Sequence, residues 1–327
     1  MQLNVLCQSP VSTGMSPAQA VRNTVQLAQA ADRLGYHRFW VAEHHSDAAL
    51  ASGAPEVLMG AVAAATDRIR VGSGGVQLLF YSPFKVAEQF NALTALHPGR
   101  IDLGVGRSGG SEGSAPSALG IRNQGARAFE AFDELLSWLG LGSARRPFAD
   151  TWAMPRHDEP PEVWVLGTSP NSARFAAERG LPYAFGGFLD PRSLAPSLAT
   201  YHQQFHPNAS GQGPRVNVAW NVLAAETAEE AEHLARTTVH WFVHTMLRRS
   251  NPTFEDPDLL DDSDYSPMER AMAGVMRQVA LVGTAEQVLD GLSALKKQTM
   301  ADEFTLVTIP FDHHARVRSY ELVAAAR

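Results

Sequence analysis

The sequence predicts an α/β protein folded as one (β/α)8 TIM barrel over residues 1–327, with an insertion and a mobile loop at the C-terminal mouth. Eight apolar runs of strand length alternate with segments of helical periodicity. No linker or shift of composition divides the chain, which favours one closed barrel over a doubly wound sheet. In such a barrel the residues that follow the strands converge on one mouth.

The apolar runs define the expected strands. They are rich in aliphatic and aromatic residues and are mostly continuous, as buried parallel strands are. The expected strands cover residues 3–7, 37–42, 69–76, 101–105, 162–166, 182–185, 216–223 and 303–308.

Helix-start signals follow several of these strands. Ser16, Pro17 and Gln19 combine an N-cap serine, a proline at the first helical position and a glutamine at N3. Serine before proline recurs at 82–83 and 169–170. The expected helices cover residues 17–34, 56–66, 83–96, 124–140, 170–179, 191–205, 226–245, 267–277 and 284–297, and the chain from about 313.

Three segments have no apolar periodicity. Residues 106–123 are rich in Gly and Ser, and a loop of this length in a compact domain usually has a function. The Pro-rich residues 145–161 form the insertion, for which no element is assigned. Residues 248–266 carry several Pro and Asp residues, and we expect a mobile loop over the mouth there.

The composition argues against several classes of partner. Hydrophobic residues make up 45% of the chain and the net charge is -7, with Lys and Arg scattered in no run longer than two. We therefore expect no nucleic-acid surface. The single cysteine, Cys7, can form no internal disulfide, which fits a reducing compartment. With no signal-peptide pattern and no apolar run of membrane-spanning length, we expect a cytoplasmic protein without a membrane partner.

A carboxylate and two imidazoles end the expected strand 37–42. Glu43, His44 and His45 would face whatever the barrel mouth binds. The alternative is that the histidines only cap a loop. Adjacent strand residues point to opposite sides, so we do not expect the two to share a metal ion. The sequence Asp312-His313-His314 is interpreted as the N-cap and first turn of the last helix, and no metal site is predicted.

Glycines interrupt the expected strand 69–76. Gly72, Gly74 and Gly75 stand where a strand normally carries side chains. Glycine inside a strand marks a bulge or the close approach of a flat ligand to the backbone. The alternative is packing at a barrel corner that needs small residues.

Residues 104–109 match the dinucleotide fingerprint, but a Gly/Ser loop follows them where the fingerprint requires a helix. What remains is Arg107 at a strand tip, able to bind an anion through its guanidinium. An exposed loop arginine is the alternative.

A second anion-binding feature follows the strand 162–166. The start of the next helix carries three hydroxyl side chains after Gly167, those of Thr168, Ser169 and Ser172. The first amides of a helix are unbonded, and phosphate binds readily there. Capping alone would need only Ser169. Because the two strands are neighbours in a barrel, Arg107 and this helix start could bind the same phosphate.

Taken together, these stretches resemble the bacterial-luciferase-like flavin monooxygenase family, in its single-chain form, over nearly the whole chain. The segments that carry the resemblance are residues 41–45, 70–76, 81–89, 99–107, 169–174 and 312–320.

The resemblance implies a TIM barrel that binds FMN across its mouth and uses molecular oxygen to oxygenate a small organic substrate through a C4a-peroxyflavin. It implies that a separate flavin reductase supplies the reduced FMN, and we also expect a homodimer. An imidazole near its ordinary pKa would suit proton transfer at neutral pH. His44 is therefore the expected catalytic residue, with Glu43 shaping the ring site.

The resemblance also assigns the cofactor-binding residues. It places the phosphate-binding arginine on Arg107 and the hydroxyl ligands on Ser169 and Ser172, beside Gly167 and Thr168. It places a non-proline cis peptide bond on Gly74-Gly75.

One departure from the family pattern concerns luminescence. The luciferase subunit that carries the chemistry has a cysteine just before the arginine, and this chain has Gly106. Aldehyde-oxidising luminescence is therefore not expected. Two other functions stay open, a deazaflavin-dependent oxidoreductase on the same barrel and a non-enzymatic flavin-binding protein.

Overall fold

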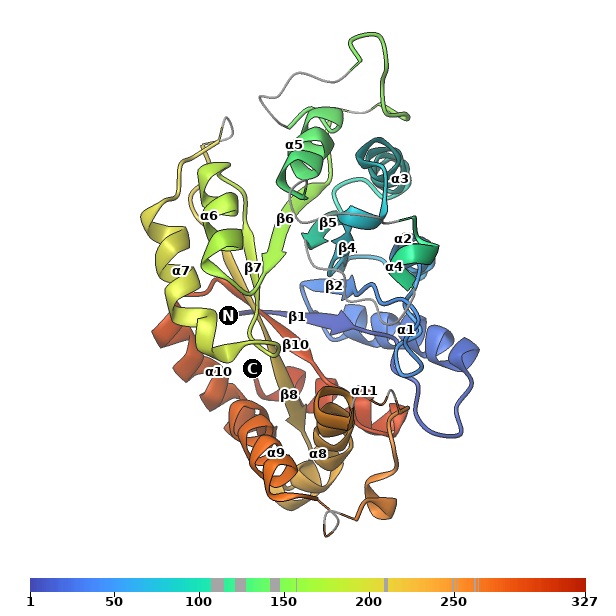
Figure 1. The fold of residues 1–327 in the computed structure, drawn as a ribbon, viewed down its shortest axis with the longest axis vertical. Coiled ribbons are helices and arrows are strands. Elements are labelled where there is room, and N and C mark those ends of the chain that lie inside the picture. The colour runs from blue at the N-terminus through green and yellow to red at the C-terminus, as the bar shows by residue number, and fades with distance from the viewer. Residues whose placement is uncertain are drawn as a thin grey trace.

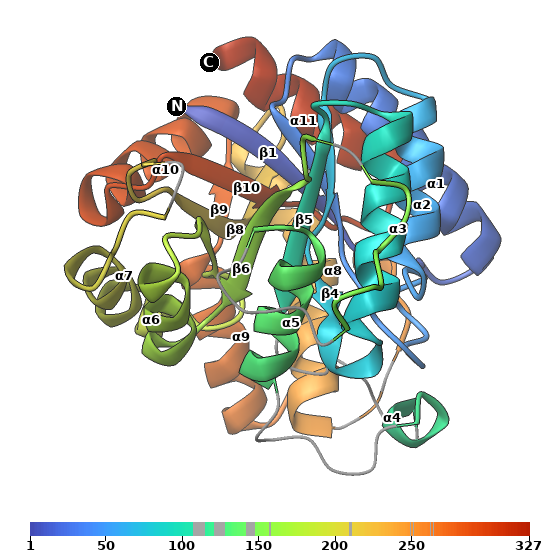
Figure 2. The same cartoon turned by 90° about the horizontal axis from the view of Figure 1, so that it is seen from above.

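The apolar runs form one parallel barrel in the computed structural model (Figures 1 and 2). The structure describes residues 1–106, 115–120, 128–141, 148–156, 158–208, 211–248, 250, 252–261, 263 and 265–327. Pairing of the last strand with both the first strand and β8 closes the ring. Around the ring the eight strands are β1 (Gln2–Cys7), β2 (Arg38–Val41), β3 (Arg70–Ser73), β5 (Ile101–Gly106), β6 (Glu162–Gly167), β7 (Tyr183–Gly186), β8 (Val216–Ala224) and β10 (Glu303–Val307).

Helices surround the barrel, and their apolar faces pack on the outside of the strands. Several begin as the sequence predicts. Ser16 caps the first helix by accepting a hydrogen bond from the Gln19 amide, and Asp312 caps the last from the Ala315 amide. The main helices are α1 (Pro17–Arg33), α2 (Pro55–Ala64), α3 (Pro83–Leu96), α5 (Ala128–Trp138), α6 (Pro170–Glu178), α7 (Leu194–Gln203), α8 (Ala228–Val243), α9 (Pro267–Val279), α10 (Ala285–Thr299) and α11 (His313–Ala326).

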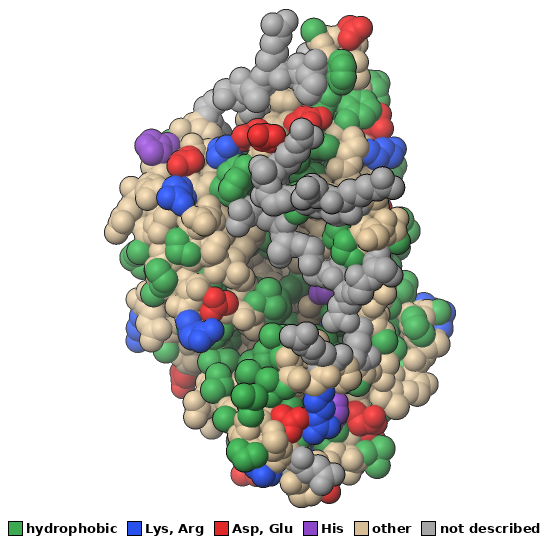
Figure 3. Space-filling view, viewed as in Figure 1, with side chains coloured by type: hydrophobic (Ala, Val, Ile, Leu, Met, Phe, Trp, Pro, Cys, Tyr) green, Lys and Arg blue, Asp and Glu red, His purple; other side chains and the backbone are tan. Residues whose placement is uncertain are grey.

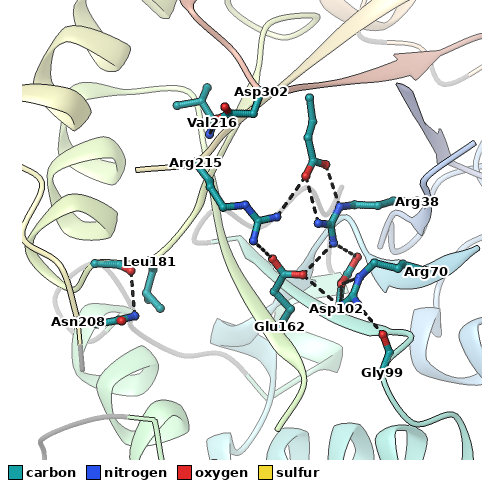
Figure 4. A network of polar contacts seen from close by, with 12 residues as sticks. Arg38, Arg70, Gly99, Asp102, Glu162, Leu181, Asn208, Arg215, Val216 and Asp302 are labelled. Atoms are coloured by element: carbon teal, nitrogen blue, oxygen red, sulfur yellow. Dashed lines mark hydrogen bonds and ion pairs between the residues drawn. The ribbon is translucent and has the colours of Figure 1, made fainter. Parts of the chain in front are cut away.

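A buried ionic network fills the amino-terminal end of the barrel (Figure 4). Arg38 is 2% exposed and lies within 2.8 Å of Asp102, 3.1 Å of Glu162 and 2.8 Å of Glu303. Arg215 pairs with Glu162 and with Glu303. Because each buried charge has opposite charges beside it, the cost of desolvating the network is largely offset.

Two tryptophans lie next to this network inside the barrel. The Trp164 ring packs against the guanidinium groups of Arg38 and Arg215, 5.0 and 4.9 Å from its centroid. Trp40 meets Trp164 edge to face at 5.5 Å and donates a hydrogen bond to Asp102. Together the charges and rings fill the barrel below the cavity described in the next section.

The third expected strand differs from the prediction. Residues 69–76 were expected as one strand, whereas β3 ends at Ser73 and a two-residue strand, β4 (Val76–Gln77), pairs with β5 instead. A cis peptide bond between Gly74 and Gly75 separates the two. The sequence analysis also missed β9 (Leu281–Gly283), a short strand that pairs with β8.

The segment 248–266 also differs from the mobile loop that was expected. Phe254 is fully buried and packs on Trp241, with ring centroids 5.1 Å apart. Its backbone exchanges hydrogen bonds with Val11 and Thr13 of the β1–α1 loop. Arg236 on α8 donates to the carbonyls of Pro257 and Leu260. The described part of the segment is thus docked on the barrel by a buried aromatic ring and several hydrogen bonds, which the search for apolar periodicity could not detect.

Candidate active site

A cavity of about 280 Å³ opens at the C-terminal mouth of the barrel. Its walls come from all eight barrel strands or the turns that follow them, and from β4. Figure 3 shows this face of the molecule, with apolar side chains gathered around a hollow near the centre of the view.

Eight of the nine residues predicted for the site line this one cavity, although they come from three separate parts of the chain. They are Glu43, His44, Gly74, Gly75, Gly167, Thr168, Ser169 and Ser172. The ninth, Arg107, lies outside the described residues. Gly106, which precedes it, lines the cavity.

Glu43 is buried and joins the end of β2 to the segment after the glycine pair. Its carboxylate accepts hydrogen bonds from the Gln77 amide at 2.8 Å, the Tyr81 hydroxyl at 2.8 Å and His45 Nε2 at 2.6 Å. Burial and the hydrogen bond to Glu43 raise the pKa of Tyr81. The phenol therefore stays protonated and donates a hydrogen bond to Glu43. This geometry makes Glu43 the centre of a rigid polar cluster behind the cavity wall.

The His44 ring lies in the cavity wall, with few polar partners. Its Nδ1 lies 3.4 Å from the Ser52 hydroxyl, and its backbone amide donates to the Ser52 carbonyl at 3.2 Å. Burial, with a smaller contribution from the His45 imidazole, lowers the pKa of His44 to about 4. The expectation of an ordinary pKa was therefore wrong, because the site removes water from this ring. At neutral pH His44 can accept a proton but carries none to donate as an acid.

The glycine pair forms a wall of the cavity and is also tightly packed. The predicted cis peptide bond is present between Gly74 and Gly75. A Cβ atom on Gly75 would lie 2.8 Å from the Gly104 carbonyl oxygen, and one on Gly74 would lie 2.6 Å from Leu6. These contacts support the packing interpretation, since a side chain at either position would clash with the barrel. The close approach of a flat ligand stays a prediction.

Ser169 and Ser172 form a capping box at the start of α6. The Ser169 hydroxyl accepts from the Ser172 amide, and Ser172 Oγ accepts from the Ser169 amide at 3.3 Å. Ser172 is 2% exposed and its hydroxyl also lies 3.0 Å from the Tyr183 hydroxyl. The argument that capping needs only Ser169 was wrong. Both hydroxyls nevertheless line the cavity at a helix N-terminus, where an anion is stabilised.

Other residues complete the site and were missed. Gln77 lines the cavity and holds the Glu43 carbonyl through its side-chain amide at 2.6 Å. Phe188 and Leu189 form an apolar rim after β7, and Asn217 and Thr305 line the cavity from β8 and β10. Inward-facing positions on these strands could have been read from strand alternation, but no local motif marks them.

The described residues contain no group of three or more His, Cys, Asp or Glu side chains arranged to hold a metal ion. Among the helices that the structure describes, none is long and apolar enough to cross a membrane.

A TIM barrel with a walled cavity at its C-terminal mouth has the architecture of an enzyme. A family model described as luciferase-like monooxygenase matches residues 1–303, and the chain belongs to that family.

Relatives support this assignment along the whole chain. A protein of Escherichia coli strain K12 named luciferase-like monooxygenase is 37% identical over 98% of this chain and 95% of its own. The N-acetyl-S-alkylcysteine monooxygenase of Bacillus subtilis strain 168 is 33% identical over 100% of this chain and 98% of its own. The crystal structure of apo-MsnO8 superposes with a TM-score of 0.87 at 35% identity, covering 99% of this chain and 98% of that one.

More distant structures share the fold, and their names differ in cofactor. An oxygenating component of 3,6-diketocamphane monooxygenase from Pseudomonas putida, in complex with FMN, has a TM-score of 0.72 at 21% identity and covers 99% of this chain and 96% of that one. An F420-dependent secondary alcohol dehydrogenase has a TM-score of 0.72 at 15% identity and covers 100% of this chain and 99% of that one.

Proposed function

We propose that this protein is a monooxygenase that uses reduced FMN and molecular oxygen to oxygenate a small organic substrate. The observation that carries the proposal is the meeting, in one cavity, of His44, the glycine pair and the hydroxyls of α6. These features come from β2, β3 and β6, and each suits a different part of a flavin.

The residues of the cavity fit FMN. The glycine wall offers backbone without side chains to a flat ring. Gly167 lets the end of β6 pack against the start of α6, since a Cβ there would lie 2.2 Å from the Ser172 hydroxyl. Ser169, Ser172 and Thr168 would bind the phosphate with the helix N-terminus, and by the family resemblance Arg107 would share it.

Reduced FMN, when bound, supplies the electrons that activate oxygen. The residues of the protein orient the cofactor, exclude water and move a proton. The glycine wall and the α6 hydroxyls orient the ring and the phosphate, and the apolar rim of Phe188 and Leu189 helps to exclude water. His44 accepts or returns one proton at Nε2 or Nδ1 as a neutral base, because its pKa of about 4 leaves it uncharged at neutral pH. Glu43 stabilises the cavity wall next to His44 through its hydrogen bonds with Gln77 and Tyr81.

We also propose that a separate flavin reductase supplies the reduced FMN, and that the protein acts as a homodimer in the cytoplasm. The family resemblance supports the reductase, and the dimer and the location stay predictions. The relative named for N-acetyl-S-alkylcysteine makes thioethers a first class to test.

A deazaflavin-dependent oxidoreductase is the competing function, because an F420-dependent enzyme shares the fold. Calorimetric titration with FMN and with F420 tests the choice. We expect FMN to bind at least ten-fold more tightly, and the reduced FMN complex to consume oxygen. Tighter binding of F420, with a reduced complex inert to oxygen, would establish the competing function. Binding of FMN whose reduced form converts oxygen to peroxide as fast as free reduced FMN would favour a flavin carrier.

A further inference from the structure

The side of the cavity opposite the glycine wall has a polar floor. β8 lies four places from β3 in either direction around the ring of eight strands, so the two face each other across the barrel. Asn217 on β8 and Thr305 on β10 line the cavity on this side, and each is 1% exposed. The neighbouring wall is built from small residues, namely Ala184, Gly186 and Ala219.

A chain of hydrogen bonds determines which way the Asn217 amide is turned. Asn4 Nδ2 donates to the Glu303 carboxylate at 2.8 Å and to Thr305 Oγ1 at 3.4 Å. The Thr305 hydroxyl therefore keeps its own proton for Asn217 Oδ1, which lies 2.9 Å away. Asn217 Nδ2 is the end of the chain, and it has no hydrogen-bond partner among the described residues.

A buried amide N–H without an acceptor is costly, and a protein keeps one where an acceptor arrives from outside. A buried water could serve. A substrate oxygen could serve as well, because Asn217 belongs to the cavity wall and lies across the barrel from the residues proposed for the flavin. A buried water and a substrate oxygen differ in one measurable respect. Only if a substrate oxygen binds there does Asn217 discriminate between ligands.

We propose that Asn217, held by Thr305, binds a neutral carbonyl oxygen of the substrate at the closed end of the cavity. The inference rests on the proposed function, because it assumes that the flavin lies against the glycine wall. The substrate atom is an acceptor, since an amide nitrogen only donates. It is uncharged, because the described cavity residues include no Lys or Arg to compensate a carboxylate. The apolar body of the substrate packs against Phe188 and Leu189.

Binding of acetophenone and of α-methylstyrene to the FMN-loaded protein tests this inference by calorimetry. The two probes have nearly the same shape, and only acetophenone has an acceptor oxygen. We expect the wild type to prefer acetophenone about ten-fold, as one hydrogen bond allows, and to bind benzoate more weakly than acetophenone. Asn217→Leu should lose the preference. Asn221→Leu makes the same change on the same strand at a residue outside this cavity, and should keep it.

The outcomes separate this inference from the proposed function. Failure of the wild type to bind FMN would overturn the function itself. FMN binding with no preference for acetophenone, or a preference that survives Asn217→Leu, would overturn only the inference and leave Asn217 to a buried water. Should Asn217→Leu not fold, Thr305→Val keeps the amide but removes the hydroxyl that holds it. An unchanged preference in Thr305→Val would then overturn the inference.

Discussion

Glu43 and His44 are adjacent in the sequence, and the structure gives them different surroundings. Glu43 is surrounded by donors and joins two strand ends, whereas His44 has one long contact to Ser52 and lies in the cavity wall. The sequence marked both because polar residues at a strand tip converge on a barrel mouth. It could not separate their surroundings, because Gln77, Tyr81 and Ser52 reach them from other elements. The pKa of His44 was likewise out of reach, since burial depends on the assembled barrel.

The protonation of His44 can be measured directly. Because desolvation disfavours the imidazolium, we expect its ring resonances to titrate with a midpoint near pH 4, well below those of exposed histidines. Histidine-selective NMR over pH 3.5 to 8 would record this, with His44→Gln identifying the resonance by its loss. A midpoint between pH 6 and 7 would contradict the neutral base and restore an ordinary histidine.

The role of Ser172 is testable because capping and phosphate binding have different consequences. Ser172→Ala should cost about 1 kcal/mol of stability through the lost cap. It should also weaken FMN binding about ten-fold, since a hydrogen bond to a charged group is worth about 1.5–3 kcal/mol, while riboflavin affinity stays nearly unchanged.

Gln287→Ala is the matched control for Ser172→Ala. Gln287 is the N3 residue of the α10 capping box, its side chain accepts from the Thr284 amide as Ser172 Oγ accepts from the Ser169 amide, and it is absent from the cavity wall. It should lose similar stability without any effect on either flavin. If Ser172→Ala weakens FMN and riboflavin equally, its hydroxyl is a helix cap and no phosphate ligand.

At the scale of elements, the strand and helix order was predictable, and the interruptions were not. Periodicity and capping located the barrel strands and most helices within a few residues. The break at Gly74-Gly75 was implied only by the family resemblance, because a glycine-rich strand can equally be continuous. β9 was missed because a run of three residues carries no periodicity. The docking of segment 248–266 was not predicted, because the buried side chain of Phe254 that helps to dock it stands in a stretch without apolar periodicity.

Phe254→Ala should release the docked segment. A buried phenyl ring contributes about 3–5 kcal/mol in a protein core, and Phe254 is more deeply buried than Leu260 and Tyr265 of the same segment. We expect limited proteolysis to cut the variant within 248–266 at least ten-fold faster than the wild type, as mass spectrometry of the fragments would show. Leu259→Ala removes an exposed side chain, 73% accessible, from the same segment and should leave the rate unchanged. Equal rates in both variants would mean that other contacts dock the segment.

At the scale of the molecule, the barrel is closed at one end by charge and open at the other. Burial raises the pKa of Glu303 and Glu162, but the guanidinium groups of Arg38 and Arg215 outweigh it and hold both below the ordinary value. A carboxylate with a lowered pKa stabilises the fold above its unfolded pKa of about 4.3 and loses that contribution as pH falls through the folded value.

The acid limb of the stability curve should therefore depend on this network. Urea unfolding of the wild type should show a nearly constant free energy from pH 7 to pH 5 and a fall below about pH 4.5. Glu303→Gln should be less stable at pH 7 by about 3–5 kcal/mol, because Arg38 and Arg215 lose a buried partner, and its acid limb should be shallower. An acid limb of unchanged slope would place the titrating groups elsewhere.

The central claim is that the cavity at the mouth holds reduced FMN and directs its reaction with oxygen. Stopped-flow mixing of the anaerobic complex with oxygen tests it most directly, with oxygen uptake and hydrogen peroxide release followed together. We predict that peroxide release lags behind oxygen uptake in the wild type, because the closed, apolar site keeps water and protons from the reacting atoms. Peroxide that appears in step with oxygen uptake, at the rate seen with free reduced FMN, would contradict the account.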